Sequence, residues 1–133
     1  MEREFISYVE REFISYEHAL AMKKLGFNEV CFGYYNNLGN YLAELKTNSN
    51  CNKPGMYDEY CTVPLYQQTF RFFREKYNLF APIIDNGLGS YDFRINYNST
   101  WSGRIWNTYE EAELACLNKL IEIAKTDNPN FKM

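Results

Sequence analysis

The sequence has no long apolar run, no cluster of basic residues and no apolar leader. No stretch approaches the roughly 18 consecutive apolar residues that a membrane-spanning helix needs. Residues 1–13 are largely charged and lack the apolar segment of a secretory signal. No run of Lys and Arg is present and the formal net charge is −3, so the electrostatic footprint of a nucleic-acid-binding protein is missing. We therefore expect a cytoplasmic protein in a reducing compartment, with nucleic acid excluded as the main partner.

Motifs for catalysis and metal binding are also absent. The four cysteines, Cys31, Cys51, Cys61 and Cys116, include no pair at the short spacing of a zinc site, and His18 is the only histidine. The chain contains no P-loop, G-x-S-x-G or H-E-x-x-H motif. We expect reduced thiols, no metal, no cofactor and no enzymatic activity. His18 is interpreted as an exposed helix residue, because a nucleophile would have to be brought to it in space.

Aromatic residues are abundant. They make up 18% of the 133 residues, with 12 Tyr and 10 Phe, while hydrophobic residues reach 46% and charged residues 23%. This is the composition of a globular protein, and a disordered chain is excluded. Because aromatic rings bury a large area at low entropic cost, a chain of this length can build a core from them.

Two internal repeats are visible. Residues 2–8 recur as residues 10–16 with seven identities, so residues 1–9 are interpreted as a duplicated extension. Residues 10–126 are then expected to form a single α+β domain, with residues 127–133 as a C-terminal tail. A fainter repeat has an offset of fifty, at which residues 36–41 (NNLGNY) face residues 86–91 (NGLGSY). Both segments carry the Gly and Asn of hairpin turns. The pattern leaves open a true repeat or two hairpins that share the same turn chemistry.

Hydrophobic periodicity predicts three helices and five strands. Ser15 and Gly26 bracket the first helix, Pro64 precedes the second, and Thr108 with Glu111 forms a capping box before the third. Pro82 inside the third strand indicates an edge strand or a bulge. The expected helices are residues 16–25, 65–77 and 108–125, and the expected strands are residues 29–35, 41–46, 79–84, 91–97 and 101–106.

This order predicts an α+β fold with two αββ units plus a C-terminal helix. The helices are expected on one face of a mostly antiparallel sheet. Apolar residues cover more than half of the circumference of helix 108–125. Such a helix is either covered on two sides within its own chain or forms a homodimer through its second side.

Several segments resemble a family of short uncharacterised proteins encoded by bacteriophages and mobile elements of gut-type bacteria. The resemblance covers about residues 10–125 and rests on residues 12–27, 60–62, 70–77, 107–113 and 117–123. The extra copy at residues 1–9 departs from the usual start. The family carries no catalytic motif that could be transferred to this chain. What the resemblance implies is a small phage-type accessory protein in the cytoplasm of a bacterial host.

Two groups of residues are candidates for ligand binding. Gln67, Arg71 and Arg74 share one polar stripe of the second helix, and two Arg a turn apart can hold a carboxylate or phosphate. Alternatively, Glu75 neutralises Arg71 and the stripe is a solvated surface.

The second group combines two Arg with two Trp. Arg94, Trp101, Arg104 and Trp106 could clamp a nucleotide by stacking and charge. The alternative is a structural segment in which Trp covers an edge of the sheet.

The resulting functional hypothesis is a non-enzymatic accessory protein that binds a host protein, with counter-defence as one such role. The alternative is a small-ligand binder that sequesters an anionic nucleotide signal through Arg and aromatic side chains.

Overall fold

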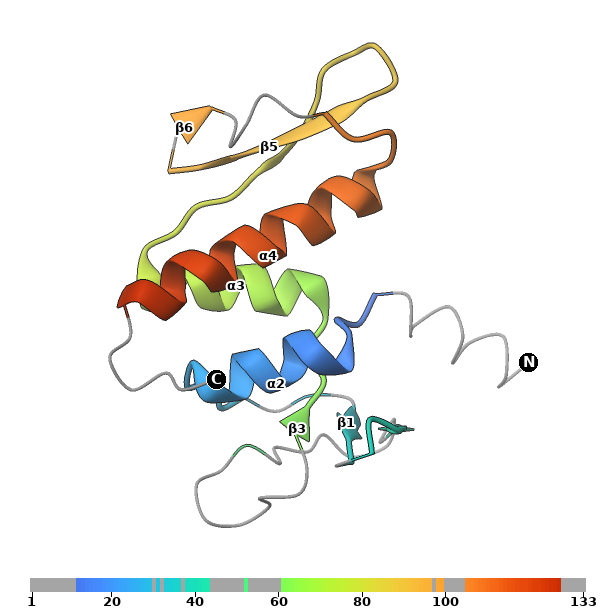
Figure 1. The fold of residues 1–133 in the computed structure, drawn as a ribbon, viewed down its shortest axis with the longest axis vertical. Coiled ribbons are helices and arrows are strands. Elements are labelled where there is room, and N and C mark those ends of the chain that lie inside the picture. Colours follow the sequence, from blue (N-terminus) through green and yellow to red (C-terminus); the bar gives the residue numbers. More distant parts are fainter. Residues whose placement is uncertain are drawn as a thin grey trace, which may run out of the picture. The chain divides into compact units, whose positions relative to one another are not determined.

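The structure, a computed structural model, describes residues 12–29, 31, 33–36, 38–43, 52, 61–96, 98–99 and 105–127. The chain divides into two compact units, residues 1–69 with 131–133 (unit 1) and residues 70–130 (unit 2), and each is treated by itself. The described residues form three helices and two three-stranded antiparallel sheets (Figure 1). The expected α+β class is confirmed.

Unit 1 opens with helix α2 (Tyr16–Lys24). Its N-cap is Ser15, whose hydroxyl accepts a hydrogen bond from the backbone N–H of His18 at 3.4 Å. The helix is followed by Gly26 at φ +94°, the left-handed conformation that glycine adopts without strain. Both predicted ends are therefore confirmed. The buried apolar residues of this unit are Phe13, Ile14, Ala19, Met22, Leu25, Phe27, Cys31, Cys61 and Val63.

The sheet of unit 1 has the order β2-β1-β3, with β1 (Gly33–Tyr35) in the centre. Strand β2 (Tyr41–Ala43) pairs with one edge of β1, and β3 (Cys61–Thr62) pairs with the other. Both pairings are antiparallel. The second is extended by a hydrogen bond of 3.0 Å from the N–H of Val63 to the carbonyl oxygen of Gly33. Strand β1 thus has partners on both edges.

A buried asparagine joins two parts of unit 1. Asn52 is only 7% exposed. Its amide nitrogen donates to the carbonyl oxygen of Phe27 at 2.8 Å, and its amide oxygen accepts from the N–H of Thr62 at 3.0 Å. The Asn52 side chain therefore satisfies two polar groups in the interior.

Helix α3 (Tyr66–Tyr77) crosses the boundary between the units. Asn78, at φ +56°, follows its last residue. Aromatic residues form one stripe of this helix, in which Phe73 is fully buried, while Tyr66, Phe70 and Tyr77 are half-buried. Phe72, which lies off that stripe, is also buried.

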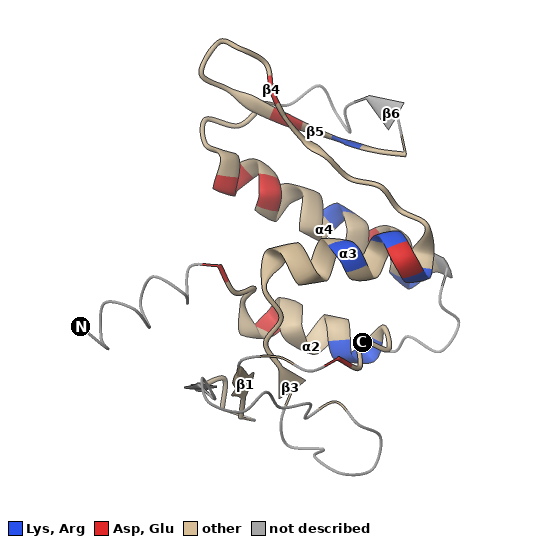
Figure 2. Cartoon of the chain, turned by 180° about the vertical axis from the view of Figure 1, so that it is seen from behind, with Lys and Arg blue, Asp and Glu red and all other residues tan. Residues whose placement is uncertain are grey.

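Unit 2 combines a sheet with the C-terminal helix. The sheet has the order β4-β5-β6, with β4 (Ile83–Asp85), β5 (Tyr91–Ile95) and β6 (Asn98–Ser99). Helix α4 (Tyr109–Asp127) packs against β4 and β5. Acidic residues gather at its first turn, where they favour the helix dipole (Figure 2). The buried apolar residues of this unit are Phe72, Phe73, Leu79, Phe93, Ile95, Ala112, Cys116, Leu117, Leu120, Ile121 and Ala124.

The repeat at an offset of fifty residues is also visible in the structures of the two αββ units. Helices α2 and α3 begin at Tyr16 and Tyr66, and strands β1 and β4 begin fifty residues apart. The hairpin registers match at the same offset: Gly33 faces Ala43 and Ile83 faces Phe93. The described residues therefore contain the same αββ arrangement twice.

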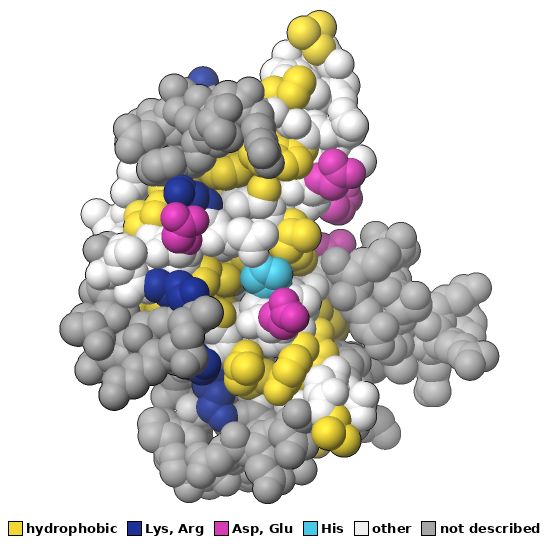
Figure 3. Space-filling view, in the orientation of Figure 1, with side chains coloured by type: hydrophobic (Ala, Val, Ile, Leu, Met, Phe, Trp, Pro, Cys, Tyr) yellow, Lys and Arg dark blue, Asp and Glu magenta, His cyan; other side chains and the backbone are white. Residues whose placement is uncertain are grey.

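The two hairpin turns have the same internal bonds. The side-chain oxygens of Asn36 and Asn86 accept from the N–H of Leu38 (2.9 Å) and Leu88 (3.1 Å). The leucines are 79% and 88% exposed. Figure 3 shows hydrophobic side chains at the end of the β4–β5 hairpin. Each unit thus displays an apolar side chain on a turn of the same construction.

Several strand predictions change in detail. The strands, expected in one sheet, form a separate three-stranded sheet in each unit, because each αββ unit closes its own hydrogen-bonded ladder. The fifth strand, expected at residues 101–106, is represented by β6 at residues 98–99 and by a single bridge between Trp106 and Tyr91. Residues 101–104 lie outside the described residues, as do residues 1–9 and 128–133. The expected domain boundaries stay a prediction.

The apolar excess of helix α4 is largely covered by its own chain. Ala112, Cys116, Leu117, Leu120 and Ala124 are fully buried. One further apolar residue of the helix, Leu114, is 39% exposed. The homodimer through this helix stays a prediction.

We predict that alanine at the turn glycines destabilises the two hairpins unequally. Both glycines have positive φ, +81° at Gly39 and +77° at Gly89, which costs an L-residue about 1–2 kcal/mol. A Cβ at Gly39 would also lie 3.3 Å from the Tyr16 ring, whereas none of the described atoms lies within 4 Å of one at Gly89. Urea unfolding should show the larger loss for Gly39→Ala. A loss of equal or greater size for Gly89→Ala would contradict the described turn geometry.

We predict that Asn52→Ala lowers the free energy of unfolding by about 1–3 kcal/mol, because it removes two hydrogen bonds to buried backbone groups. Asn52→Asp retains an acceptor for the N–H of Thr62 but loses the donor to Phe27. Chemical denaturation should therefore rank both variants well below wild type. Wild-type stability in Asn52→Ala would show that the two bonds do not form in solution.

Candidate functional site

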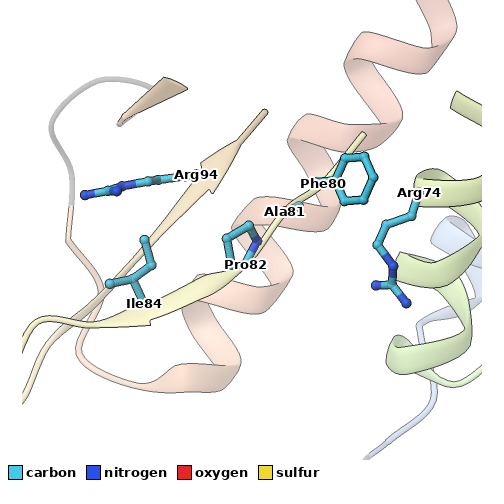
Figure 4. Close-up of a pocket in the computed structure, with 6 residues that line it drawn as sticks. All are labelled: Arg74, Phe80, Ala81, Pro82, Ile84 and Arg94. Atoms are coloured by element: carbon cyan, nitrogen blue, oxygen red, sulfur yellow. The ribbon is translucent and has the colours of Figure 1, made fainter. Parts of the chain in front are cut away.

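A cavity of about 460 Å³ lies on unit 2, beside strand β4. It is lined by Arg74 of helix α3, by residues of the segment that leads into and forms β4, and by Arg94 of β5 (Figure 4). All of its lining residues belong to one unit. The complete lining is Arg74, Phe80, Ala81, Pro82, Ile84 and Arg94.

The apolar part of the cavity follows from the alternation of side chains along an extended segment. Phe80, Pro82 and Ile84 are two residues apart and so share one face. The N–H of Arg94 donates to the carbonyl oxygen of Pro82 at 3.2 Å, and that of Asn96 donates to Phe80 at 2.8 Å. The hydrogen-bonded ladder with β5 therefore continues N-terminal to the first residue of β4. These bonds hold the three apolar side chains in a row.

Strand β5 separates its charged residues from its buried ones. Phe93 and Ile95 are 3% and 2% exposed, whereas Arg94 is exposed. Since neighbouring residues of a strand point to opposite faces, Arg94 projects from the face that α4 does not cover. Exposure thus alternates along residues 93–95, while Tyr91 and Asp92 are both half-buried.

Arg74 differs from the other cations of helix α3. The Nε atom of Arg71 lies 4.0 Å from a carboxylate oxygen of Glu75. The ammonium group of Lys76 lies over the rings of Phe72 and Tyr77, 5.5 and 5.7 Å from their centroids. Neither Arg74 nor Arg94 has an ion-pair or hydrogen-bond partner for its guanidinium among the described residues. The cavity thus holds two exposed cations without a described counter-charge.

The two guanidinium groups lie at opposite ends of the apolar row. In Figure 4, Arg94 lies beside Ile84 and Arg74 lies beside Phe80, and neither points toward the other. A single phosphate between them is therefore not what this arrangement suggests. A longer ligand with two negative groups and an apolar middle fits it better.

The structure brings together only part of the residues predicted from the sequence. Arg74 and Arg94, from different candidate groups, line the same cavity. Arg71 is paired with Glu75, as the alternative for that group holds, and Gln67 is exposed and does not line the cavity.

The tryptophans do not join Arg94 among the described residues. Trp106 stacks on Phe93 with ring centroids 5.3 Å apart, and its backbone pairs with Tyr91. It therefore lies with the buried face of β5, while Arg94 projects from the other. This supports the structural alternative for Trp106. Trp101 and Arg104 lie outside the described residues.

Sequence reasoning missed the apolar lining of the site. Phe80, Pro82 and Ile84 are read from the sequence as an ordinary strand, and their alternate spacing was the available signal. Phe80 is 48% exposed, which is unusual for a large aromatic side chain.

A contact between Ser15 and His18 was also missed. The hydroxyl of Ser15 lies 2.5 Å from Nδ1 of His18, three residues further along the chain. The same hydroxyl accepts from the N–H of His18, as an N-cap does. This pair of bonds is local to the start of α2, and we interpret it as a helix cap.

The titration of one cysteine is strongly shifted. Burial, together with the negative charge of Glu113, raises the pKa of Cys116 to about 12. Because the thiolate is the nucleophile, this cysteine stays protonated and unreactive at neutral pH. Cys31 and Cys61 are buried and are not in disulfides.

Among the described residues, no group of three or more His, Cys, Asp or Glu side chains is placed to hold a metal ion. No helix there has the length and hydropathy to cross a membrane.

No family model, curated protein or solved structure matches the chain. The cavity is therefore interpreted from its own residues.

We predict that Ser15→Ala lowers the free energy of unfolding by about 1 kcal/mol through loss of the helix cap. Thermal melts followed by circular dichroism measure this, and hydrolysis of p-nitrophenyl esters serves as the parallel assay. Esterase turnover that is lost in both Ser15→Ala and His18→Ala at unchanged stability would replace the capping interpretation with a catalytic one.

Proposed function

We propose that this chain is a non-enzymatic accessory protein that binds a protein of its bacterial host through the Arg74–Arg94 cavity. The observation that carries the proposal is the pair of exposed guanidinium groups, without described counter-charge, at the two ends of an apolar row. Charge-assisted hydrogen bonds to carboxylates are among the stronger polar contacts at protein surfaces. Exposed apolar side chains between them supply burial on binding. The partner surface is thus acidic at two points and apolar between them.

A nucleotide is the second candidate ligand. The observation in its favour is Phe80, a half-exposed ring that shares the cavity with both arginines. A ring of this kind can stack on a base while Arg contacts the phosphate. The separation of the two guanidinium groups favours the protein partner.

The test compares two doubly substituted proteins in capture from a lysate of a gut-type bacterium. Arg74→Ala/Arg94→Ala removes both cavity cations. Arg71→Ala/Lys119→Ala removes two cations that have acidic partners, Glu75 and Glu122, and lowers the formal net charge by the same two units. Thermal melts first establish that both are folded.

We predict that one host protein is retained by wild type and by Arg71→Ala/Lys119→Ala. Its affinity for Arg74→Ala/Arg94→Ala should be at least tenfold weaker, since hydrogen bonds to charged groups contribute about 1.5–3 kcal/mol each. Titration of the purified pair by calorimetry measures the difference. Equal loss in both double variants would mean that net charge alone governs binding and would contradict the proposal. Stabilisation by a nucleotide, abolished in Arg74→Ala/Arg94→Ala, would support the second candidate instead.

A further inference from the structure

Strand β4 is an edge strand among the described residues, and none of these residues bonds to the outer backbone groups of the segment that contains it. Among the described strands it pairs only with β5. The bonds from Arg94 to Pro82 and from Asn96 to Phe80 show that even-numbered residues of this segment face β5. In an antiparallel ladder the intervening residues direct N–H and C=O away from that partner. Ala81 and Ile83 therefore present these groups outward, and none of the described residues bonds to them there.

Proline does not protect this edge. Edge strands are often blunted by Pro, which removes a donor from the exposed side. Pro82 is an even-numbered residue, so its missing N–H lies on the side of β5. It weakens the internal ladder and leaves the outer edge able to pair.

In unit 1, the equivalent edge of the αββ arrangement is occupied by a strand. Strand β1 is the counterpart of β4 at the offset of fifty, and β3 pairs with its outer edge. The contact includes the bond from the N–H of Val63 to the carbonyl oxygen of Gly33. Gly33 corresponds to Ile83, whose carbonyl oxygen is open. Strand β3 also packs against helix α2.

The cavity of unit 2 borders this edge. Its lining includes Arg74 of α3, the counterpart of α2, and Ala81, which lies two residues before β4 and presents its backbone groups outward. We propose that this edge accepts an extended acidic segment of a partner protein, which adds to β4 as an antiparallel third strand in the way β3 adds to β1.

Charge and length define the segment. Phe80 to Ile84 spans about 13 Å at the rise of a strand, so the segment needs at least about five extended residues. Carboxylates at its two ends would meet Arg74 and Arg94. Acidic groups of the protein nearby are Asp85, which accepts from the N–H of Gly87, and Asp92, which accepts from the N–H of Phe93. Neither lines the cavity. Strand addition of this kind takes affinity from backbone bonds and specificity from alternate side chains.

This inference rests on the proposed protein binding, and its test is separate from the lysate experiment. The probes are synthetic eight-residue peptides that alternate Val and Thr and carry Glu at both ends or Lys at both ends. Binding to the full chain is followed by fluorescence anisotropy. Amide hydrogen exchange by NMR compares Ala81 and Ile83 with Ile84, whose N–H faces β5.

We expect the Glu-ended peptide to bind at least tenfold more tightly than the Lys-ended one. On binding, the amides of Ala81 and Ile83 should gain at least tenfold protection, while that of Ile84 changes little. N-methylation of the alternate peptide amides that face β4 should abolish binding. N-methylation of the other alternate amides, which face away from β4, should be tolerated. Ala81→Pro, which removes an outward N–H donor, should weaken binding of the Glu-ended peptide. If this variant fails to fold, amide exchange in the unsubstituted chain still tests the inference.

Three results would overturn the inference. The first is strong protection of Ala81 and Ile83 in the free chain, which would show that the edge is already covered. The second is equal or no binding of the two peptides. The third is binding of the Glu-ended peptide without protection of these amides, in which case acidic recognition stands and strand addition is wrong. Capture of a host protein that depends on Arg74 and Arg94 would leave the proposed function intact in each case.

Discussion

The register of the β4–β5 hairpin is the constraint on which the candidate site depends. Ile83 faces Phe93, so the odd-numbered residues of β5 turn toward α4 and the even-numbered ones turn away. A slip of one residue would exchange the two faces. Arg94 would then turn to the interior, and Phe93 would be exposed. The turn at residues 86–90 fixes this register through Asn86, whose N–H donates to the carbonyl oxygen of Ser90 and whose side chain accepts from Leu88.

The same register decides which backbone groups are available for binding. It places the carbonyl groups of Phe80 and Pro82 against β5 and leaves those of Ala81 and Ile83 at the outer edge. In unit 1 an identical register leaves the edge of β1 to β3. The two αββ units therefore share one construction. Among the described residues they differ in that a third strand pairs with β1 and none pairs with the outer edge of β4. We regard that difference as the origin of the binding role we propose.

Much of the fold could be predicted because local chemistry determines it. Ser15, Gly26 and Asn78 mark helix ends through capping and left-handed backbone, and the alternation at residues 91–95 sets a buried and an exposed face. The offset of fifty in the sequence indicates the repeated αββ unit. Whether the strands join one sheet or two depends on pairing between distant segments, which periodicity does not contain. Burial of Phe72 likewise depends on packing and not on the helical stripe.

The candidate site was only partly predictable for the same reason. Arg74 and Arg94 carry a signal in their residue type, but their common cavity follows from how α3 leads into β4. Arg71 has the same residue type but is paired with Glu75. Only the geometry decides whether an arginine is paired or lines the cavity. Phe80, Pro82 and Ile84 have ordinary strand character, and they line the cavity because helix α4 covers the opposite face of the sheet.

The most direct test of the central claim is the pattern of NMR contacts between the α-protons of β4 and β5. Residues that face each other without hydrogen bonds approach most closely in an antiparallel pair. The described register predicts strong contacts between Ile83 and Phe93 and between Asp85 and Tyr91. Strong contacts from Ile84 to Phe93 would show a register shifted by one residue, and the cavity, its two cations and its open edge would not exist as described.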